Sequence, residues 1–145
     1  AQGNPNPKTT TQTVNMTIFD ENNSETAQAS GTVTFSSTSG AFEGDIQTEL
    51  APGNYTAILD LAHYPQEPTK GIINVAQNAS TVTLDPLEFV TGDINDDETV
   101  NILDYNILQQ CIISPETCTE PVECVRCSIL NYFSFIALLA IDNLF

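Results

Sequence analysis

The chain has few cationic and few aromatic side chains. Its 145 residues include no Trp, one His and only three Lys or Arg, against nineteen Asp or Glu, for a formal net charge of −16. Such a surface repels nucleic acid and anionic lipid headgroups and attracts divalent cations, so we expect no nucleic-acid partner. The lack of Trp, with only four Tyr, also argues against a sugar-binding platform built from aromatic faces.

A catalytic constellation is missing as well. The only histidine, His63, lies in an expected loop, and there is no second His for a triad or a hydrolytic metal site. Asp60 and Glu67 could in principle flank a glycosidic bond, but the aromatic walls of sugar-cleaving sites are absent. We therefore expect a protein that is not an enzyme.

The chain also lacks a membrane-spanning run and a signal peptide. The apolar stretch 129–141 is shorter than the roughly twenty residues that a spanning helix needs, and it contains Asn131 and Ser134. We expect it to be a helix or a strand buried against protein. The start at Ala1-Gln2 suits a mature chain whose leader was removed.

All four cysteines lie in the last third of the chain. A zinc site would need a second closely spaced pair and a nearby His, and a redox CxxC would need a βαβ context. Disulfides are therefore favoured, which indicates a secreted, extracellular or cell-surface protein. Three pairings are possible. Proximity along the sequence favours Cys111–Cys118 together with Cys124–Cys127.

Residues 12–91 show the period-2 alternation of β-strands, broken by turn residues at intervals of roughly 8–12 positions. Val14, Met16 and Ile18 share one strand face, and Tyr55, Ala57, Leu59 and Leu61 share another. This pattern predicts a mainly β domain, a Greek-key antiparallel β-sandwich of about seven strands. Residues 1–11, rich in Pro, Thr and Asn, form an extended arm before it.

Residues 93–104 have the ligand spacing of a 12-residue calcium loop. Calcium prefers six to eight oxygens, and oxygen-bearing side chains occupy positions 1, 3, 5, 9 and 12, with a backbone carbonyl at position 7. The predicted Ca²⁺ ligands are Asp93, Asn95, Asp97, the Thr99 carbonyl, Asn101 through water, and Asp104. The alternative is an acidic, solvated turn before a helix.

Two other loop positions bear on this prediction. Position 6 is normally Gly, because the turn needs a positive φ, but here it is Glu98, which should cost roughly 1 kcal/mol. Val100 at position 8 is expected to face away from the ion and pin the loop to a core. An amphipathic helix should begin near Tyr105.

The segment 92–97, preceded by the strand-like residues 87–90, resembles the F-hand half of a dockerin module, with a loop and an exit helix only. A second tandem loop is not intact: residues 128–134 and 142–145 keep only echoes of it and should not bind calcium. The resemblance implies a cohesin-like partner. Dockerins recognise partners largely through loop positions 10 and 11, here Ile102 and Leu103, and through basic helix residues, which this helix lacks.

A second resemblance lies at Glu49-Leu50-Ala51-Pro52-Gly53-Asn54-Tyr55, which looks like the L-x-P-G-x-Y corner of prealbumin-like and collagen-adhesin B-type domains. Pro52-Gly53 would make a tight turn and Tyr55 would plug the edge of the core. Four N-x-S/T sequons are possible glycosylation sites. The four asparagines are Asn15, Asn22, Asn54 and Asn78. Asn22 and Asn78 lie in predicted turns and are the favoured glycosylation sites.

Together these patterns predict a secreted structural protein with an arm (1–11), a β-sandwich (12–91) and a dockerin-like calcium loop with helices and disulfides (92–145). Neither end looks self-sufficient. We expect residues 1–19 to lend a strand to a neighbouring copy and the apolar 129–141 segment to be buried at or near an interface, giving a pilus-like filament. The alternatives are a dockerin-type module that binds a cohesin and an adhesin domain of a larger surface protein.

Overall fold

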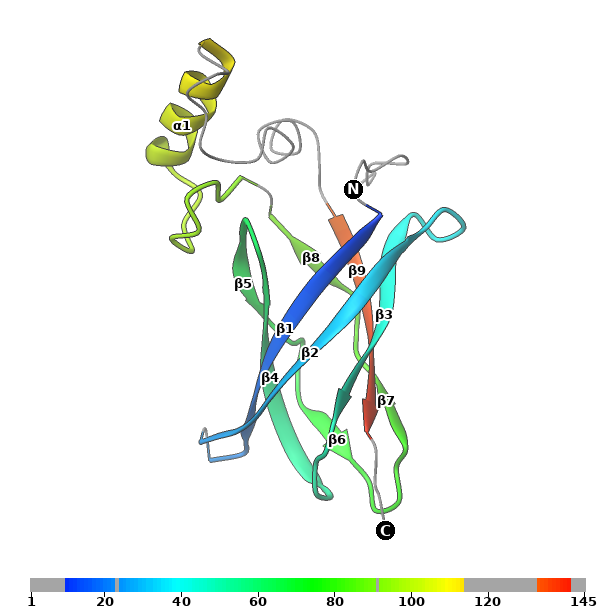
Figure 1. Ribbon diagram of the computed structural model, residues 1–145. Helices are drawn as coiled ribbons and strands as arrows, with labels where there is room; N and C mark the ends of the chain where they lie inside the picture. Colours follow the sequence, from blue (N-terminus) through cyan, green and yellow to red (C-terminus); the bar gives the residue numbers. More distant parts are fainter. Residues whose placement is uncertain (1–9, 23, 91, 114–132, 142–145) are drawn as a thin grey trace.

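The computed structural model describes residues 10–22, 24–90, 92–113 and 133–141, and the fold is mainly β, as the alternation predicted (Figure 1). The elements along the chain are β1 (Thr11–Asp20), β2 (Glu25–Ser36), β3 (Ala41–Thr48), β4 (Gly53–Leu61), β5 (Tyr64–Pro68), β6 (Ile73–Val75), β7 (Thr81–Thr83), β8 (Leu87–Phe89), α1 (Ile102–Ile113) and β9 (Phe133–Ile141).

Hydrogen bonds join these strands into one sheet. The order is β5-β4-β1-β2-β3-β9-β7, with β6 also pairing with β4 and β8 also pairing with β9. The sheet curves until β5 contacts β8 and β6 contacts β7. The rings of Tyr64 and Phe89 meet edge to face across this junction, 6.1 Å apart. The mainly β class is confirmed, but a sandwich of two sheets is not: the described strands, nine where about seven were expected, form one sheet whose ends approach each other, with β3 and β9 in parallel.

A single apolar core fills the space enclosed by the sheet. The alternating residues of β1 and β4 supply much of it, because successive side chains of a strand point to opposite faces. Full burial of each large side chain contributes about 1.5–3 kcal/mol. The buried side chains of these two strands are Val14, Met16, Ile18, Tyr55, Ala57, Leu59 and Leu61.

Two strands were not foreseen. β5 contains Pro65 and Pro68, which cannot donate ladder hydrogen bonds, and it is tolerated because it lies at the end of the strand order. The second is β9, which lies in the apolar stretch 129–141, where the sequence predicts either a helix or a strand. In the described part of the chain, no helix is long and apolar enough to cross a membrane.

The structure corrects the expectation that residues 11–19 are free to join a neighbour's sheet. They form β1, which pairs with β2 on one side and with β4 on the other. The ordered ladder extends to Thr10, whose carbonyl accepts a hydrogen bond from Phe35 N–H at 2.8 Å. Of the predicted arm, residues 1–9 lie outside the described residues. At the other end, the sheet includes residues 133–141, from within the predicted segment 92–145.

The corner before β4 agrees with the sequence expectation. Tyr55 is buried, and its hydroxyl donates a hydrogen bond to the Ala51 carbonyl at 2.8 Å. A Cβ at Gly53 would lie 3.3 Å from the Tyr55 ring, so the close approach of backbone and ring favours glycine. The tyrosine thus ties the turn to the strand that follows it.

We expect Tyr55→Phe to lower the free energy of unfolding by about 1 kcal/mol, because the Ala51 carbonyl loses its partly buried donor. Urea denaturation followed by circular dichroism measures this change. Tyr105→Phe, the same substitution at an exposed helix position, is the matched control and should change stability by less than about 0.5 kcal/mol. Equal effects in the two variants would contradict a role for the Tyr55 hydroxyl.

Candidate metal centre

The predicted calcium loop connects β8 to α1, which lies beyond one end of the sheet (Figure 1). Gly92 precedes the loop with φ +119°, and a Cβ there would meet the Val100 side chain at 3.2 Å. Both observations favour glycine, because residues with a side chain rarely adopt this backbone conformation. The loop therefore starts from a backbone position suited to glycine.

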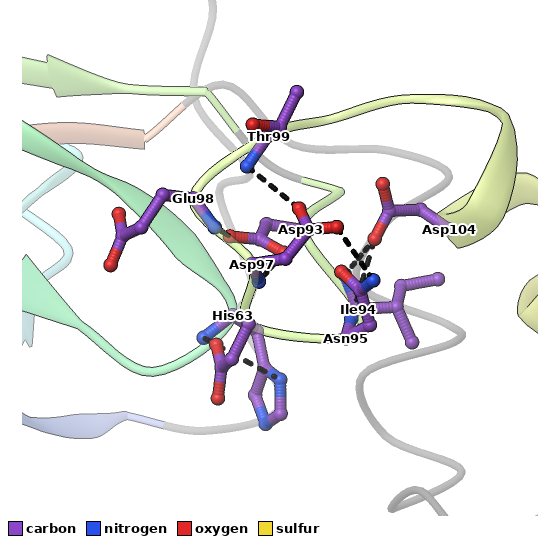
Figure 2. Close-up of polar contacts among 9 residues, drawn as sticks. His63, Asp93, Ile94, Asn95, Asp97, Glu98, Thr99 and Asp104 are labelled. Carbon is purple, nitrogen blue, oxygen red and sulfur yellow. Dashed lines mark hydrogen bonds and ion pairs between the residues drawn. The ribbon is translucent and has the colours of Figure 1, made fainter.

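Asp93 lies at the centre of the loop and is 1% exposed. Its Oδ1 accepts a hydrogen bond from Asp97 N–H at 3.0 Å, and its Oδ2 accepts one from Glu98 N–H at 2.9 Å (Figure 2). The chain therefore coils around this carboxylate, as the predicted first ligand position requires.

Asp104, the predicted last ligand, is 3% exposed and joins the two ends of the loop. Its Oδ1 accepts hydrogen bonds from Ile94 N–H at 2.7 Å and Asn95 N–H at 3.3 Å. Its Oδ2 accepts one from Asn101 N–H at 2.7 Å, while Asn101 Oδ1 accepts one from Leu103 N–H at 2.7 Å. The last two bonds form a capping box at the start of α1, with Asp in place of the usual Glu.

The remaining predicted ligands belong to the same network. Asn95 Nδ2 donates to Asp97 Oδ2 at 2.8 Å, and Asp97 Oδ1 accepts from Thr99 N–H at 3.0 Å. The Thr99 carbonyl accepts from Asn101 Nδ2 at 3.1 Å. The structure therefore brings all six predicted ligand residues together in one hydrogen-bonded loop.

The backbone bends where the loop pattern requires it. Glu98 has φ +66°, the positive value predicted for position 6, and Asp96 at position 4 has φ +55°. Neither residue is glycine, so each carries the cost of a left-handed conformation. Both are held there by contacts with another part of the fold.

Those contacts fasten the loop to the turn between β4 and β5 and to β5 itself. Asp96 Oδ1 accepts a hydrogen bond from His63 N–H at 2.5 Å and lies 3.7 Å from His63 Nδ1. Glu98 Oε2 accepts one from Gln66 N–H at 2.6 Å. No local sequence pattern predicts this clamp, because its partners are 33 and 32 residues apart in the chain.

Two expectations for this region are wrong. Val100 does not pin the loop to the core, because it is largely exposed; Ile94, next to the central carboxylate, is the buried apolar side chain. Helix α1 is not amphipathic, since its apolar residues are spread around its axis. Its only buried side chain among those described is Asp104.

The loop has an excess of negative charge that a cation would offset. Five of its twelve residues are acidic. Among the described residues, the one contact between a basic side chain and a carboxylate joins Asp96 to His63, which is charged only when protonated. Asp93 and Asp104 are therefore buried without a cationic partner in the described part of the chain. A buried carboxylate is costly unless it is paired or hydrogen-bonded. The backbone N–H groups meet part of that need and a cation would meet the rest.

The donor set decides which ion would fit. In the part of the chain described, no three His, Cys, Asp or Glu side chains form a metal-binding group. The predicted set includes three such residues, Asp93, Asp97 and Asp104, which therefore do not meet as one carboxylate group in the described structure. The set takes its other oxygens from amide side chains and a backbone carbonyl. All of these are hard oxygen ligands, which suit calcium and not zinc.

The other predicted site residues are placed only in part. Cys111 is disulfide-bonded, which agrees with the disulfide prediction; Cys118, Cys124 and Cys127 lie outside the described residues, so the pairing stays a prediction. The same holds for the degenerate echoes at 128–134 and 142–145. All four sequon asparagines are exposed: Asn22 and Asn78 in turns, Asn15 on β1 and Asn54 on β4.

The positive φ at position 98 can be tested with two variants. Glu98→Gly and Glu98→Ala both remove the hydrogen bond to Gln66, but only glycine relaxes the backbone. We expect the loop of the glycine variant to be more stable by about 1 kcal/mol, measured by amide hydrogen exchange at Asp97 and Thr99. Equal protection in the two variants would show that position 98 is not strained.

Neither protein-family models nor curated proteins nor solved structures give a match to this chain.

Proposed function

We propose that this protein is a calcium-stabilised structural subunit of an extracellular filament and assembles with copies of itself. The observation that carries the proposal is the loop at residues 93–104, where two buried carboxylates organise the backbone and two others fasten it to the sheet. The hydrogen bonds of this network hold the loop together and join it to the sheet. Such a site suits a structural role, in which the loop keeps two parts of the subunit in a fixed arrangement.

The ligands we propose for calcium are Asp93, Asn95, Asp97, the Thr99 carbonyl, Asn101 through water, and Asp104. When bound, the ion supplies positive charge to a loop with five carboxylates. Magnesium should bind poorly, because it demands a small octahedral shell and gives up its waters reluctantly. Ion binding to the folded loop alone stabilises that loop by mass action.

The clamp gives the ion an effect beyond the loop. Helix α1 continues directly from the loop. Asp96 bonds the loop to the β4–β5 turn, and Glu98 bonds it to β5. Ordering the loop therefore fixes the helical segment relative to the sheet. A subunit that transmits load along a filament needs such a rigid junction, and the disulfide at Cys111 is typical of an oxidising, extracellular setting.

We expect chelation of calcium to loosen the loop and its clamp while the sheet stays folded. Amide hydrogen exchange should speed up at Asp97, Glu98 and Asn101, and also at His63 and Gln66, whose N–H groups donate to loop carboxylates. The β1–β2 ladder is the internal control and should keep its protection. Unchanged exchange throughout 93–104 on chelation would contradict a structural role for calcium.

One observation favours a second candidate, a dockerin-type binding module. Loop positions 10 and 11, Ile102 and Leu103, are 66% and 53% exposed, and Tyr105 beside them is 56% exposed. Exposed apolar groups of this kind mark interaction sites when they are contiguous. Under this candidate, or as an adhesin domain of a larger protein, the chain would bind a different protein and would not polymerise.

Sedimentation of the full-length chain with calcium separates the two candidates. A filament subunit sediments as large species whose amount grows with concentration, and Ile102→Ser with Leu103→Ser should leave that behaviour unchanged. A binding module sediments as a monomer, and the same double substitution should abolish binding to a cohesin-like partner while calcium affinity stays the same.

A further inference from the structure

We propose that β9 is exchanged between copies, so that Phe133–Ile141 of one subunit occupies the position between β3 and β7 in the next. This inference rests on the proposed self-assembly and names the segment that makes the contact. It replaces the expectation that the first strand is donated, because β1 is paired on both sides within its own sheet.

The position of β9 in the sheet is the first reason. β9 pairs with β3 in parallel over seven residues and with β7 and β8 in antiparallel fashion. Among the described strands, β7 and β8 have no other ladder partner. Without β9 the sheet would end at β3, and two strands would lose all their ladder hydrogen bonds (Figure 1).

The side chains that flank this position are the second reason. Phe42 and Ile46 of β3, and Leu87 and Phe89 of β8, are buried core residues and all pair in register with β9. An empty position would leave an unpaired strand edge beside these apolar groups, which invites another strand. The position therefore needs an occupant, and a second copy offers an identical one.

The chain connection makes an occupant from a second copy possible. Nineteen residues, 114–132, separate the end of α1 from the start of β9. Because Cys111 is disulfide-bonded, a link to Cys118, Cys124 or Cys127 shortens the reach of this connection to roughly 25–50 Å, depending on the pairing. With the pairing that proximity favours, the longer reach does not confine β9 to its own sheet. By contrast, four residues connect β1 to β2, with Asp20 N–H bonded to the Ser24 carbonyl at 3.1 Å. A strand tied this closely to its neighbour is hard to donate alone.

The composition of β9 also suits exchange. Its sequence, FSFIALLAI, has no charged residue, no Pro and no Gly, in a chain of formal net charge −16. Inserting it into another copy therefore brings no like charge into the pairing site. The donor is β9 of one copy and the acceptor is the position between β3 and β7 of the next, so the contact joins two different parts of the subunit. Such a heterologous contact can repeat from copy to copy without forming a closed ring, which produces a fibre.

Cysteine pairs across the β3–β9 register test the exchange. Gln47 pairs with Ala140 and is exposed. We would refold an equimolar mixture of two full-length chains, one with Gln47→Cys and one with Ala140→Cys, with calcium, oxidise it mildly and identify linked peptides by mass spectrometry. A 47–140 link in this mixture can form only between copies. If Ala140→Cys does not fold, Asp45→Cys with Leu138→Cys provides a second registered pair.

A matched mixture reports on the rival strand. Thr13 of β1 and Thr32 of β2 are paired and both exposed, so copies carrying Thr13→Cys and Thr32→Cys should give no linked dimer. We expect the 47–140 link in up to about one in four contacts between copies, the share in which a Gln47→Cys acceptor meets an Ala140→Cys donor, and none of the 13–32 link. The reverse pattern would overturn the proposal in favour of exchange of β1.

The outcomes also separate this inference from the proposed function. Fibres without a 47–140 link between copies, together with an intramolecular link in the double variant Gln47→Cys/Ala140→Cys, would overturn the exchange and leave the filament standing. Linked dimers without fibres would support the exchange and refute the filament. Unlinked monomers would refute both.

Discussion

Asp104→Ala should weaken calcium binding by about ten- to a hundredfold. The substitution removes a charged ligand, and it also leaves the Ile94, Asn95 and Asn101 N–H groups without their acceptor. Losing a charged hydrogen-bonding partner costs about 1.5–3 kcal/mol, and each 1.4 kcal/mol is a factor of ten in affinity. Isothermal titration calorimetry of the full-length chain measures the change. Undiminished affinity in Asp104→Ala would refute the site.

Because Asp104 also caps α1, a gentler pair of variants separates ion binding from loop folding. Asp97→Asn removes one charge at a predicted ligand, keeps an oxygen that can accept from Thr99 N–H, and should lower calcium affinity at least about tenfold, or 1.4 kcal/mol. Asp96→Asn removes the same charge at a position whose carboxylate faces His63. It should change calcium affinity only slightly, so equal losses in the two variants would indicate a diffuse charge effect.

Calcium and salt should strongly promote assembly of the full-length chain. At −16 per subunit, copies repel one another, and screening shortens the range of that repulsion from about 30 Å at 0.01 M salt to about 8 Å at 0.15 M. We expect the concentration needed for assembly to fall severalfold over this range and to fall further with millimolar calcium. Light scattering against protein concentration, with electron microscopy of the product, measures both effects.

Magnesium at the same ionic strength is the control for calcium. It screens charge equally well but fits the loop poorly, so calcium should lower the threshold for assembly further than magnesium does. The extra effect should be smaller in Asp97→Asn and retained in Asp96→Asn. A monodisperse monomer at high protein concentration with calcium present would refute the filament and favour the binding module.

The elements recognised from the sequence share one property, which is that their pattern is local. Period-2 alternation identified β1 and β4, because half-buried strands place every second residue in the core. The corner at Tyr55 was likewise contained in seven consecutive residues, and its hydroxyl bonds four positions back. The mainly β class followed from such segments.

The strands missed or misjudged depended on partners distant in the chain. β5 holds two prolines and is a strand only because the end of the strand order accepts them. The apolar run at 133–141 could be a helix or a strand by periodicity alone, and its pairing with β3 decided the matter. The pairing of β1 with β2 and with β4 showed that residues 11–19 are not a free arm.

For the candidate site, the spacing of oxygen-bearing residues from Asp93 to Asp104 and the positive φ at position 98 could be predicted from the sequence, since both follow from twelve consecutive residues. Three features required the folded structure: the bonds from Asp96 to the β4–β5 turn and from Glu98 to β5, the burial of Ile94 in place of Val100, and the completion of the sheet by β9. The difference lies in how far apart the interacting residues are in the sequence. A loop's backbone geometry is set by its own residues, whereas burial and strand pairing depend on segments that are distant in the sequence and meet only in the folded chain.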